Sequence, residues 1–282
     1  MYYASKKNAF TVLEVIFVIV ILGVVASISS ELIVRVYEQY IIQRAEYRAS
    51  LKTGLASIQI ANRLANAIPG TIYRIKNNNH YEPIESNLTA SGELYKGIQW
   101  VAADMDSFNT SIIPGWSGFC DLNASKTPTI STPGSNLSKT NTIISKLAGG
   151  TLPLFNPVLY FPHDPKPYPI TTPLSGSTIT FTGTIPTHIA EHYKLAWSSY
   201  ALVVEPEIIN GKTYNSLFLY YHFVPTPAVL YTAGRKALLM RNISTFKFKS
   251  SGQTIRFKIC KEEKVSENIN ENITACKEKA VF

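Results

Sequence analysis

A long apolar run close to the N-terminus dominates the pattern of the chain. Between Phe10 and Ile28 the only polar residues are Thr11, Glu14 and Ser27. About 19–20 apolar residues at ~1.5 Å per residue cover a hydrocarbon core of ~30 Å, so the run predicts a membrane-spanning helix. Backbone groups in lipid must be paired internally, and for a single span only a helix achieves this.

Charged residues on both sides of the run predict its orientation. Lys6 and Lys7 precede it, and Glu31 follows it. Because basic flanks stay in the cytoplasm, the remaining ~250 residues are expected outside. A secretory signal peptide is the alternative. However, its apolar core usually has about 7–15 residues, and no small-x-small cleavage site with a clear change in chain character follows Ala26.

The helical pattern continues beyond the apolar run. Apolar residues recur at three- and four-residue spacing, and Pro69-Gly70 then favours a stop. In the second half these apolar positions are Tyr47, Leu51, Leu55, Ile58, Ala61, Ala65 and Ile68. We expect one helix from near Phe10 to near Ile68, with Gly54 as a weak point. Its second-half apolar stripe should pack on a globular head of the same chain.

The rest of the chain, residues 70–282, is long enough for one sizeable core. Runs rich in β-branched and aromatic residues predict strands at Ile72–Ile75, Ile98–Val101, Ser199–Val204, Ser216–Val224, Ser244–Phe248, Thr254–Ile259 and Lys279–Phe282. Residues 123–186 are rich in Ser, Thr, Pro, Asn and Gly and predict long surface loops. The predicted class is α+β, with the long helix against an antiparallel sheet.

The string around the start of the apolar run has a specific resemblance. Lys6-Lys7-Asn8-Ala9-Phe10-Thr11-Val12-Leu13-Glu14-Val15 resembles the processing site of type IV prepilins and type II secretion pseudopilins. The resemblance implies cleavage by a prepilin peptidase between Ala9 and Phe10, followed by N-methylation of Phe10. The family usually has Gly before the cut, where this chain has the small residue Ala9.

Glu14 has a physical role in this motif. A carboxylate within a membrane span costs roughly 2.5–3.5 kcal/mol and normally has a partner. The new amine of Phe10 on one subunit could pair with Glu14 of a neighbour, which offsets part of both costs. The alternative is a simple signal anchor whose Glu14 reaches the interface or is protonated.

A second, shorter resemblance lies near the C-terminus. The segment from Leu238 to Phe248 resembles a leucine pair, Asn-Ile and Phe strand of the larger minor pseudopilins, the J-type subunit first and the W-type minor pilin next. Together the resemblances imply a pilin-like fold with a leader at 1–9, a filament-core helix at 10–30, its amphipathic extension at 31–69 and a periplasmic head at 70–282.

The implied location and partners follow from the same family. The protein would sit in the inner membrane and be extracted into a periplasmic filament. Its partners would be other pilin or pseudopilin subunits, the prepilin peptidase and methyltransferase, a platform protein and membrane lipid. Protein secretion, DNA uptake and surface pili remain open as settings. A different interpretation is an uncleaved, signal-anchored periplasmic binding protein or enzyme.

The chain contains three cysteines, Cys120, Cys260 and Cys276. Cys260 ends one predicted strand and Cys276 precedes the next, so in an oxidising compartment we expect these two to form a disulfide. The closed loop of about 15 residues would stabilise the fold by ~3 kcal/mol in the chain-entropy model. Cys120 follows an aromatic turn and is expected to be a buried thiol. No metal-type cysteine spacing occurs.

Two Asn-x-Ser/Thr sequons have an acidic residue two positions before the Asn, at Asn87 and Asn123. This extended form resembles the acceptor of some bacterial N-glycosylation systems, although chance is the simpler explanation in an Asn/Ser/Thr-rich chain.

The net charge is +8, with a basic cluster at Lys247, Lys249, Arg256, Lys258, Lys261 and Lys264. A solvated strand face balanced by Glu262, Glu263 and Glu267 is favoured over direct nucleic-acid binding, which stays open.

The sequence offers no convincing catalytic site, and we expect neither an enzyme nor a cofactor. His188-Ile189-Ala190-Glu191-His192 fits an H-x-x-E-H zinc pattern with Glu267 downstream, but Pro186 and strand-like flanks argue for a short ordinary helix. Asp104 and Asp106 form a D-x-D pair. Because Phe108 stands where the next oxygen ligand of calcium would be, a turn with local Asp hydrogen bonds is favoured.

Overall fold

The computed structural model describes residues 11–85, 95–108, 112–149, 157–162, 164–252, 254–265 and 272–281. One long N-terminal helix and several antiparallel sheets confirm the predicted α+β class. The chain divides into two compact units. The first comprises Met1–Ala49 with Glu263–Ile273, and the second comprises Ser50–Glu262 with Thr274–Phe282.

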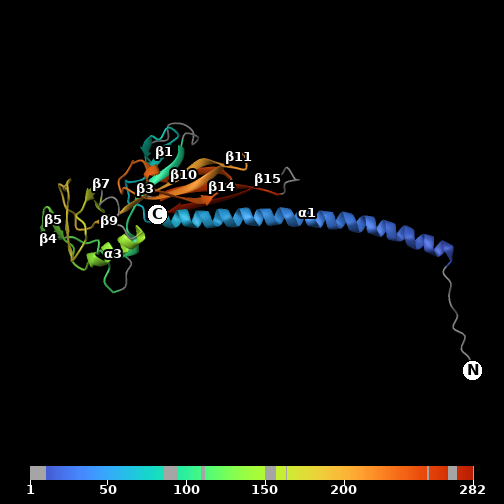
Figure 1. Ribbon diagram of the computed structural model, residues 1–282, viewed down its shortest axis with the longest axis horizontal. Coiled ribbons are helices and arrows are strands. Elements are labelled where there is room, and N and C mark those ends of the chain that lie inside the picture. Colours follow the sequence, from blue (N-terminus) through green and yellow to red (C-terminus); the bar gives the residue numbers. More distant parts are fainter. Residues whose placement is uncertain are drawn as a thin grey trace, which may run out of the picture. The chain divides into compact units, whose positions relative to one another are not determined.

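The long helix, α1, runs from Val12 to Leu64 without interruption (Figure 1). Gly54 therefore does not break it. The predicted end at Ile68 is wrong, because the chain leaves the helix after Leu64 to pair with a strand. Ala67 forms an isolated bridge with Ala102, and the N–H of Ile68 donates to the Val101 carbonyl at 2.8 Å.

The largest sheet has six strands in the order β12-β11-β10-β3-β1-β2. Their bounds are β1 Tyr73–Lys76, β2 Tyr81–Pro83, β3 Tyr95–Ala102, β10 Ser198–Ile209, β11 Lys212–Phe223 and β12 Arg235–Met240. All of the pairings are antiparallel. A tight turn at Asn210-Gly211, both with positive φ, joins the two longest strands, β10 and β11.

The C-terminal sheet has the order β13-β14-β15. Its strands are β13 Ile243–Ser251, β14 Thr254–Lys264 and β15 Asn272–Val281. The predicted strands at Ser244–Phe248 and Thr254–Ile259 are confirmed but extend further, and the last strand begins at Asn272 rather than at Lys279. Gly252, with φ +60°, lies in the turn between β13 and β14, as its sequence predicted.

The principal core of the second unit lies between the last turns of α1 and the two sheets. Ala56, Ile60 and Leu64 share one buried cluster with residues of both sheets. The sheet members include Ile98, Trp100, Leu202, Leu217, Leu219, Ile255, Phe257 and Ile259. The hydroxyl of Thr53 also donates to the Ala275 carbonyl of β15 at 3.5 Å. The expected packing of a helix on an antiparallel sheet is thus confirmed for this part of α1.

The middle of the chain is not the set of long loops that its composition predicted. Residues 123–186 include most of β4 Asp121–Lys126 and all of β5 Thr129–Ser131, α3 Leu137–Leu147, β6 Val158–Phe161, β7 Asp164–Pro169 and β8 Thr178–Thr180. On either side of them are α2 Met105–Phe108 and β9 Lys194–Ala196. These elements enclose a second core with Trp116, Leu137 and Phe181 among its members. The sequence did not indicate this core, because its strands are short and some of its polar residues cap helices. Asn136, for example, accepts the N–H of Lys139 at 3.2 Å at the start of α3.

Candidate functional site: an exposed apolar face of the long helix

Of the residues given a role in the predicted processing motif, Glu14 is the one that the structure describes. Lys6, Lys7, Ala9 and Phe10 lie outside the described residues. Glu14 is exposed, and its N–H donates to the Thr11 carbonyl at 3.0 Å and to the Thr11 hydroxyl at 3.4 Å. Thr-x-x-Glu is the spacing of a helix capping box, and an acidic residue in the first turn also suits the helix dipole.

The first part of α1 is long and apolar enough to cross a membrane, by its length and composition. None of its apolar window is buried within the structure. A signal sequence near an N-terminus would pass the same test, so this finding supports a membrane-spanning segment only weakly.

The second half of α1 has an apolar face that the head does not cover. The sequence predicted that Leu51, Leu55 and Ile58 would pack on the head, and this is wrong: these side chains are 47%, 54% and 46% exposed. The head instead buries Ile60, which is only 1% exposed, together with Ala56 and Leu64.

The two faces lie on opposite sides of the helix. A residue advances the helix by about 100°, so Leu51 and Ile60, nine residues apart, point in opposite directions. We call the uncovered positions of the second unit the apolar stripe: Leu51, Leu55 and Ile58, all exposed. Four- and three-residue steps relate them, so they form one line along this part of α1.

Side-chain size explains which face packs on the sheets. Thr53, Ala56 and Ser57 are small and buried, so the helix backbone can approach the sheets closely at these turns. Larger side chains enter the core only at Ile60 and Leu64, near the end of the helix. Because both faces are apolar, the periodicity alone could not indicate which one the head takes.

The predicted disulfide between Cys260 and Cys276 is present, with a Cα–Cα distance of 4.1 Å. It joins the neighbouring strands β14 and β15 of the C-terminal sheet. Cys120 is a buried free thiol, as predicted, and its sulfur lies 3.4 Å from the Ser125 hydroxyl. Burial raises the pKa of this thiol, which makes it a poor nucleophile.

Only one of the two candidate glycosylation sites can be placed. Asn123 lies on β4 and is exposed, and its N–H donates to the carboxylate of Asp121 at 3.0 Å. The acidic residue of this sequon therefore accepts a local backbone hydrogen bond. Asn87 lies outside the described residues.

The H-x-x-E-H string does not form a zinc site. His188–His192 is not helical, which also contradicts the expected short helix, so the spacing does not place both histidines on one helix face. The Glu191 carbonyl instead accepts the N–H of Cys120 at 2.7 Å. Glu267 lies outside the described residues, and among those described no group of three His, Cys, Asp or Glu could hold a metal.

The Asp104–Asp106 pair is used in a local turn, as the sequence favoured. Asp104 is buried and caps α2: its carboxylate accepts the Ser107 N–H at 3.2 Å and also the Ser107 hydroxyl. The indole N–H of Trp116 donates to the Asp104 carbonyl at 2.8 Å. Burial raises the pKa of Asp104 to about 6.

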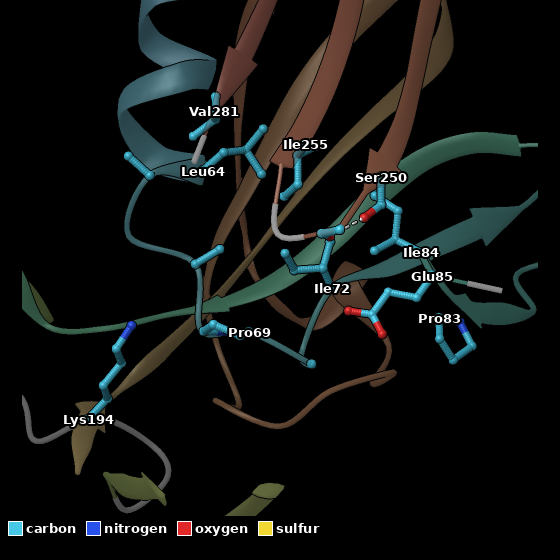
Figure 2. Close-up of a pocket in the computed structure, with 14 residues that line it drawn as sticks. Leu64, Pro69, Ile72, Pro83, Ile84, Glu85, Lys194, Ser250, Ile255 and Val281 are labelled. Carbon is cyan, nitrogen blue, oxygen red and sulfur yellow. Dashed lines mark hydrogen bonds between the residues drawn. The ribbon is translucent and has the colours of Figure 1, made fainter. Parts of the chain in front are cut away.

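A small cavity of about 190 Å³ lies near the end of α1 (Figure 2). Its lining includes Leu64, Ile72, Ile84, Ile255 and Val281, with Glu85 and Lys194 as its charged members. Burial lowers the pKa of Lys194. The apolar lining resembles an imperfectly filled core more than a catalytic cleft.

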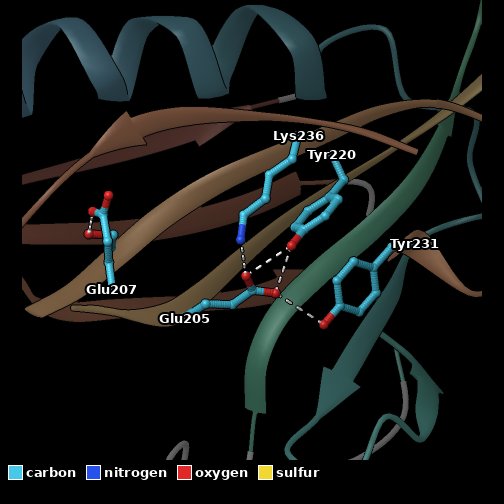
Figure 3. Close-up of polar contacts among 6 residues, drawn as sticks. Glu205, Glu207, Tyr220, Tyr231 and Lys236 are labelled. Atoms are coloured by element: carbon cyan, nitrogen blue, oxygen red, sulfur yellow. Dashed lines mark hydrogen bonds and ion pairs between the residues drawn. The ribbon is translucent and has the colours of Figure 1, made fainter. Parts of the chain in front are cut away.

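A polar cluster on β10, β11 and β12 was not anticipated from the sequence (Figure 3). Glu205 accepts hydrogen bonds from the Tyr220 hydroxyl at 2.9 Å and from Lys236 Nζ at 2.6 Å, and the Tyr231 hydroxyl lies at 3.4 Å. Burial and Glu205 together raise the pKa of Tyr231 to about 12. The polar groups of this cluster are therefore hydrogen-bonded to one another. The cluster links β10, β11 and β12 to the segment that contains Tyr231.

The basic cluster lies on β13 and β14. Of its residues, Lys261 is buried, and the exposed ones are Lys247, Lys249, Arg256, Lys258 and Lys264. Glu262 is exposed on β14.

Comparisons with protein-family models, with curated proteins and with solved structures found no match. The motif at the start of α1 and the exposed apolar stripe are therefore the features that bear on function.

Proposed function

We propose that the chain is a minor pilin or pseudopilin, a non-enzymatic subunit that joins a filament through its long helix. The observation that carries this proposal is the apolar stripe on α1. The head uses the opposite face of the helix, so Leu51, Leu55 and Ile58 stay exposed. Exposed apolar patches mark contact sites with proteins or membranes, and here the second face would contact a neighbouring subunit.

The motif from Lys6 to Val15 supports the same proposal from the sequence side. Cleavage between Ala9 and Phe10 would place a positive amine at the start of the apolar helix. Glu14 is exposed, and among the residues that the structure describes no ion pair involves it, so its carboxylate could pair with a neighbour's amine. Pairing the two charges in lipid offsets part of the desolvation cost of each and sets the axial register between subunits.

The fold and the disulfide support a pilin-like subunit with a head outside the cytoplasm. A long N-terminal helix whose last turns pack on an antiparallel sheet is the arrangement that the family resemblance implies. The Cys260–Cys276 disulfide suits an oxidising compartment such as the periplasm. The proposed partners are other pilins, the peptidase, a platform protein and membrane lipid. The proposal covers three settings: protein secretion, DNA uptake and surface pili.

Mass spectrometry of the N-terminus, on protein purified from its own membranes, tests this proposal directly. The expected result is a mature chain that begins at N-methylated Phe10. A chain that still begins at Met1 or Tyr2 would overturn it and favour the uncleaved, signal-anchored binding protein or enzyme.

Replacement of Glu14 provides a second test with a matched control. Glu14→Gln should leave cleavage intact but reduce incorporation into filaments, measured as the fraction of subunit in the sheared filament pool. Glu31→Gln removes an acidic residue at the other end of the apolar run, where Glu31 pairs with Arg35 on the same exposed helix surface, and should have little effect. Equal incorporation of both variants would contradict a pairing role for Glu14.

A further inference from the structure

The register of β13 and β14 places four cations together. Lys247 pairs directly with Lys258, and Lys249 pairs directly with Arg256. Directly opposite residues of an antiparallel pair share one face, and so do residues two apart on one strand. These four side chains therefore form a two-by-two array, which we call the cationic face.

The cationic face is the outer face of the C-terminal sheet. The alternate positions face the core: Phe246 pairs with Ile259, and Phe248 pairs with Phe257, all in or against the buried cluster with α1. The four cations are exposed, and within the described residues none of them forms an ion pair.

Acidic residues near the array leave it positive. On β14, Glu262 lies on the same face but beyond Cys260. On β15, Glu278 lies two residues beyond Cys276 and so shares the face that the disulfide occupies. Of the other glutamates that the sequence favoured as a local balance, Glu263 is partly buried on β14 and Glu267 lies outside the described residues.

This arrangement is unfavourable for the fold itself. Like charges directly opposite one another on a sheet are destabilising, and two such pairs are adjacent here. Thr or an opposite charge at one position of each pair would remove the repulsion. The array is thus better explained by an anionic ligand than by the stability of the sheet.

The composition of the face indicates the class of ligand. Its neighbouring positions on the two strands, Thr245, Ser251 and Thr254, are polar. Protein interfaces are depleted in Lys and enriched in aromatic residues, and membrane-surface segments add apolar anchors. Single-stranded nucleic acids bind on aromatic platforms, and this face has none. Lys and Arg without apolar partners are typical of contacts to the phosphates of a duplex.

We propose that the cationic face binds the phosphate backbone of duplex nucleic acid without reading its sequence. Four phosphate contacts predict that the logarithm of the binding constant falls with the logarithm of salt concentration with a slope of roughly −3.6, and non-specific binding of this kind has a Kd of about 10⁻⁴–10⁻⁶ M. The inference does not depend on cleavage at Ala9 or on filament assembly.

The test uses the full chain in micelles of an uncharged detergent and a short fluorescent duplex of mixed sequence. Binding is measured by anisotropy over a series of NaCl concentrations. The double variant Lys247→Thr/Lys258→Thr should weaken binding at least tenfold at low salt and reduce the slope by about 2. The control Lys126→Thr/Lys212→Thr removes the same charge at exposed positions on β4 and β11 and should keep the wild-type slope.

A gain-of-binding variant separates loss of contact from misfolding. Glu278→Gln removes an acid from the cationic face and should tighten binding severalfold, a result that an unfolded variant could not give. Equal weakening by the control pair, or no change in either double variant, would overturn the proposal. So would binding to anionic lipid vesicles but not to the duplex, which would assign the face to a membrane instead.

Discussion

Both faces of α1 beyond residue 50 have large apolar side chains, but only one of them packs on the head. One face buries Thr53, Ala56, Ile60 and Leu64 among the sheets, whereas the other leaves Leu51, Leu55 and Ile58 in solvent. The difference shows that apolar character alone does not decide burial. The packed face is the one with small residues, because close approach of helix and sheet depends on side-chain size as well as on hydrophobicity.

The largest effect should come from the packed face. Ile60→Ala removes a side chain that is 1% exposed, and we expect a loss of about 2–5 kcal/mol in the free energy of unfolding, from lost transfer energy and a residual cavity. Urea unfolding of the full chain in micelles, followed by tryptophan fluorescence, measures it. Ile58→Ala makes the same chemical change on the exposed face and is the matched control. Similar losses for both variants would contradict the two-face description.

The next largest loss of stability should come from removing the disulfide of the C-terminal sheet, on which the packed face of α1 lies. Cys260→Ser/Cys276→Ser opens a loop with a sequence separation of 16 and should cost ~3 kcal/mol. Unfolding with and without reductant checks this: reductant should destabilise the wild type and leave the double variant unchanged. Cys120→Ser should keep the response to reductant; a wild type indifferent to reductant would show that the disulfide adds nothing.

A change of pH should alter the stability of the head through Asp104, which lies outside both faces of α1. Asp104 has a folded pKa of about 6, above the ordinary value of 3.8, so the folded state binds its proton more tightly than the unfolded state. Its contribution is fully present below about pH 4, is lost as pH rises through about 6, and amounts to about 3 kcal/mol. The free energy of unfolding of wild type and Asp104→Asn across this range measures it.

The exposed Asp106 supplies the control for the pH series. Asp106→Asn should keep the wild-type fall in stability between pH 4 and pH 6, whereas Asp104→Asn should flatten it. A fall of the same size in both variants would assign the pH dependence to other groups.

The smallest effect on stability should come from the exposed face. Leu55→Ala should change the free energy of unfolding by less than about 0.5 kcal/mol, since the side chain is already 54% exposed. The same variant should lower incorporation into filaments, measured by shearing and immunoblotting. Lys52→Ala, also on the solvent side of α1, is the control for incorporation. Normal incorporation of Leu55→Ala would remove the stripe from the proposed interface.

The regular parts of the fold were predictable because their signals are local. The long helix, the C-terminal hairpin and the disulfide follow from unbroken periodicity, a Ser-Gly turn and two cysteines at the ends of predicted strands. The second core was missed because its strands are short and its polar residues, such as Asn136, serve as caps. Glu205 and Tyr231 were missed as partners because 26 residues separate them in the chain.

Local patterns in the sequence are enough to predict that α1 is a long helix with an apolar N-terminal part and an acidic residue in its first turn. They also show that Lys and Arg recur along the last strands. The helix face that the head covers, and the position of Lys247 opposite Lys258, became known from the folded chain alone. Burial and strand register depend on contacts between residues far apart in the chain, which local periodicity does not specify.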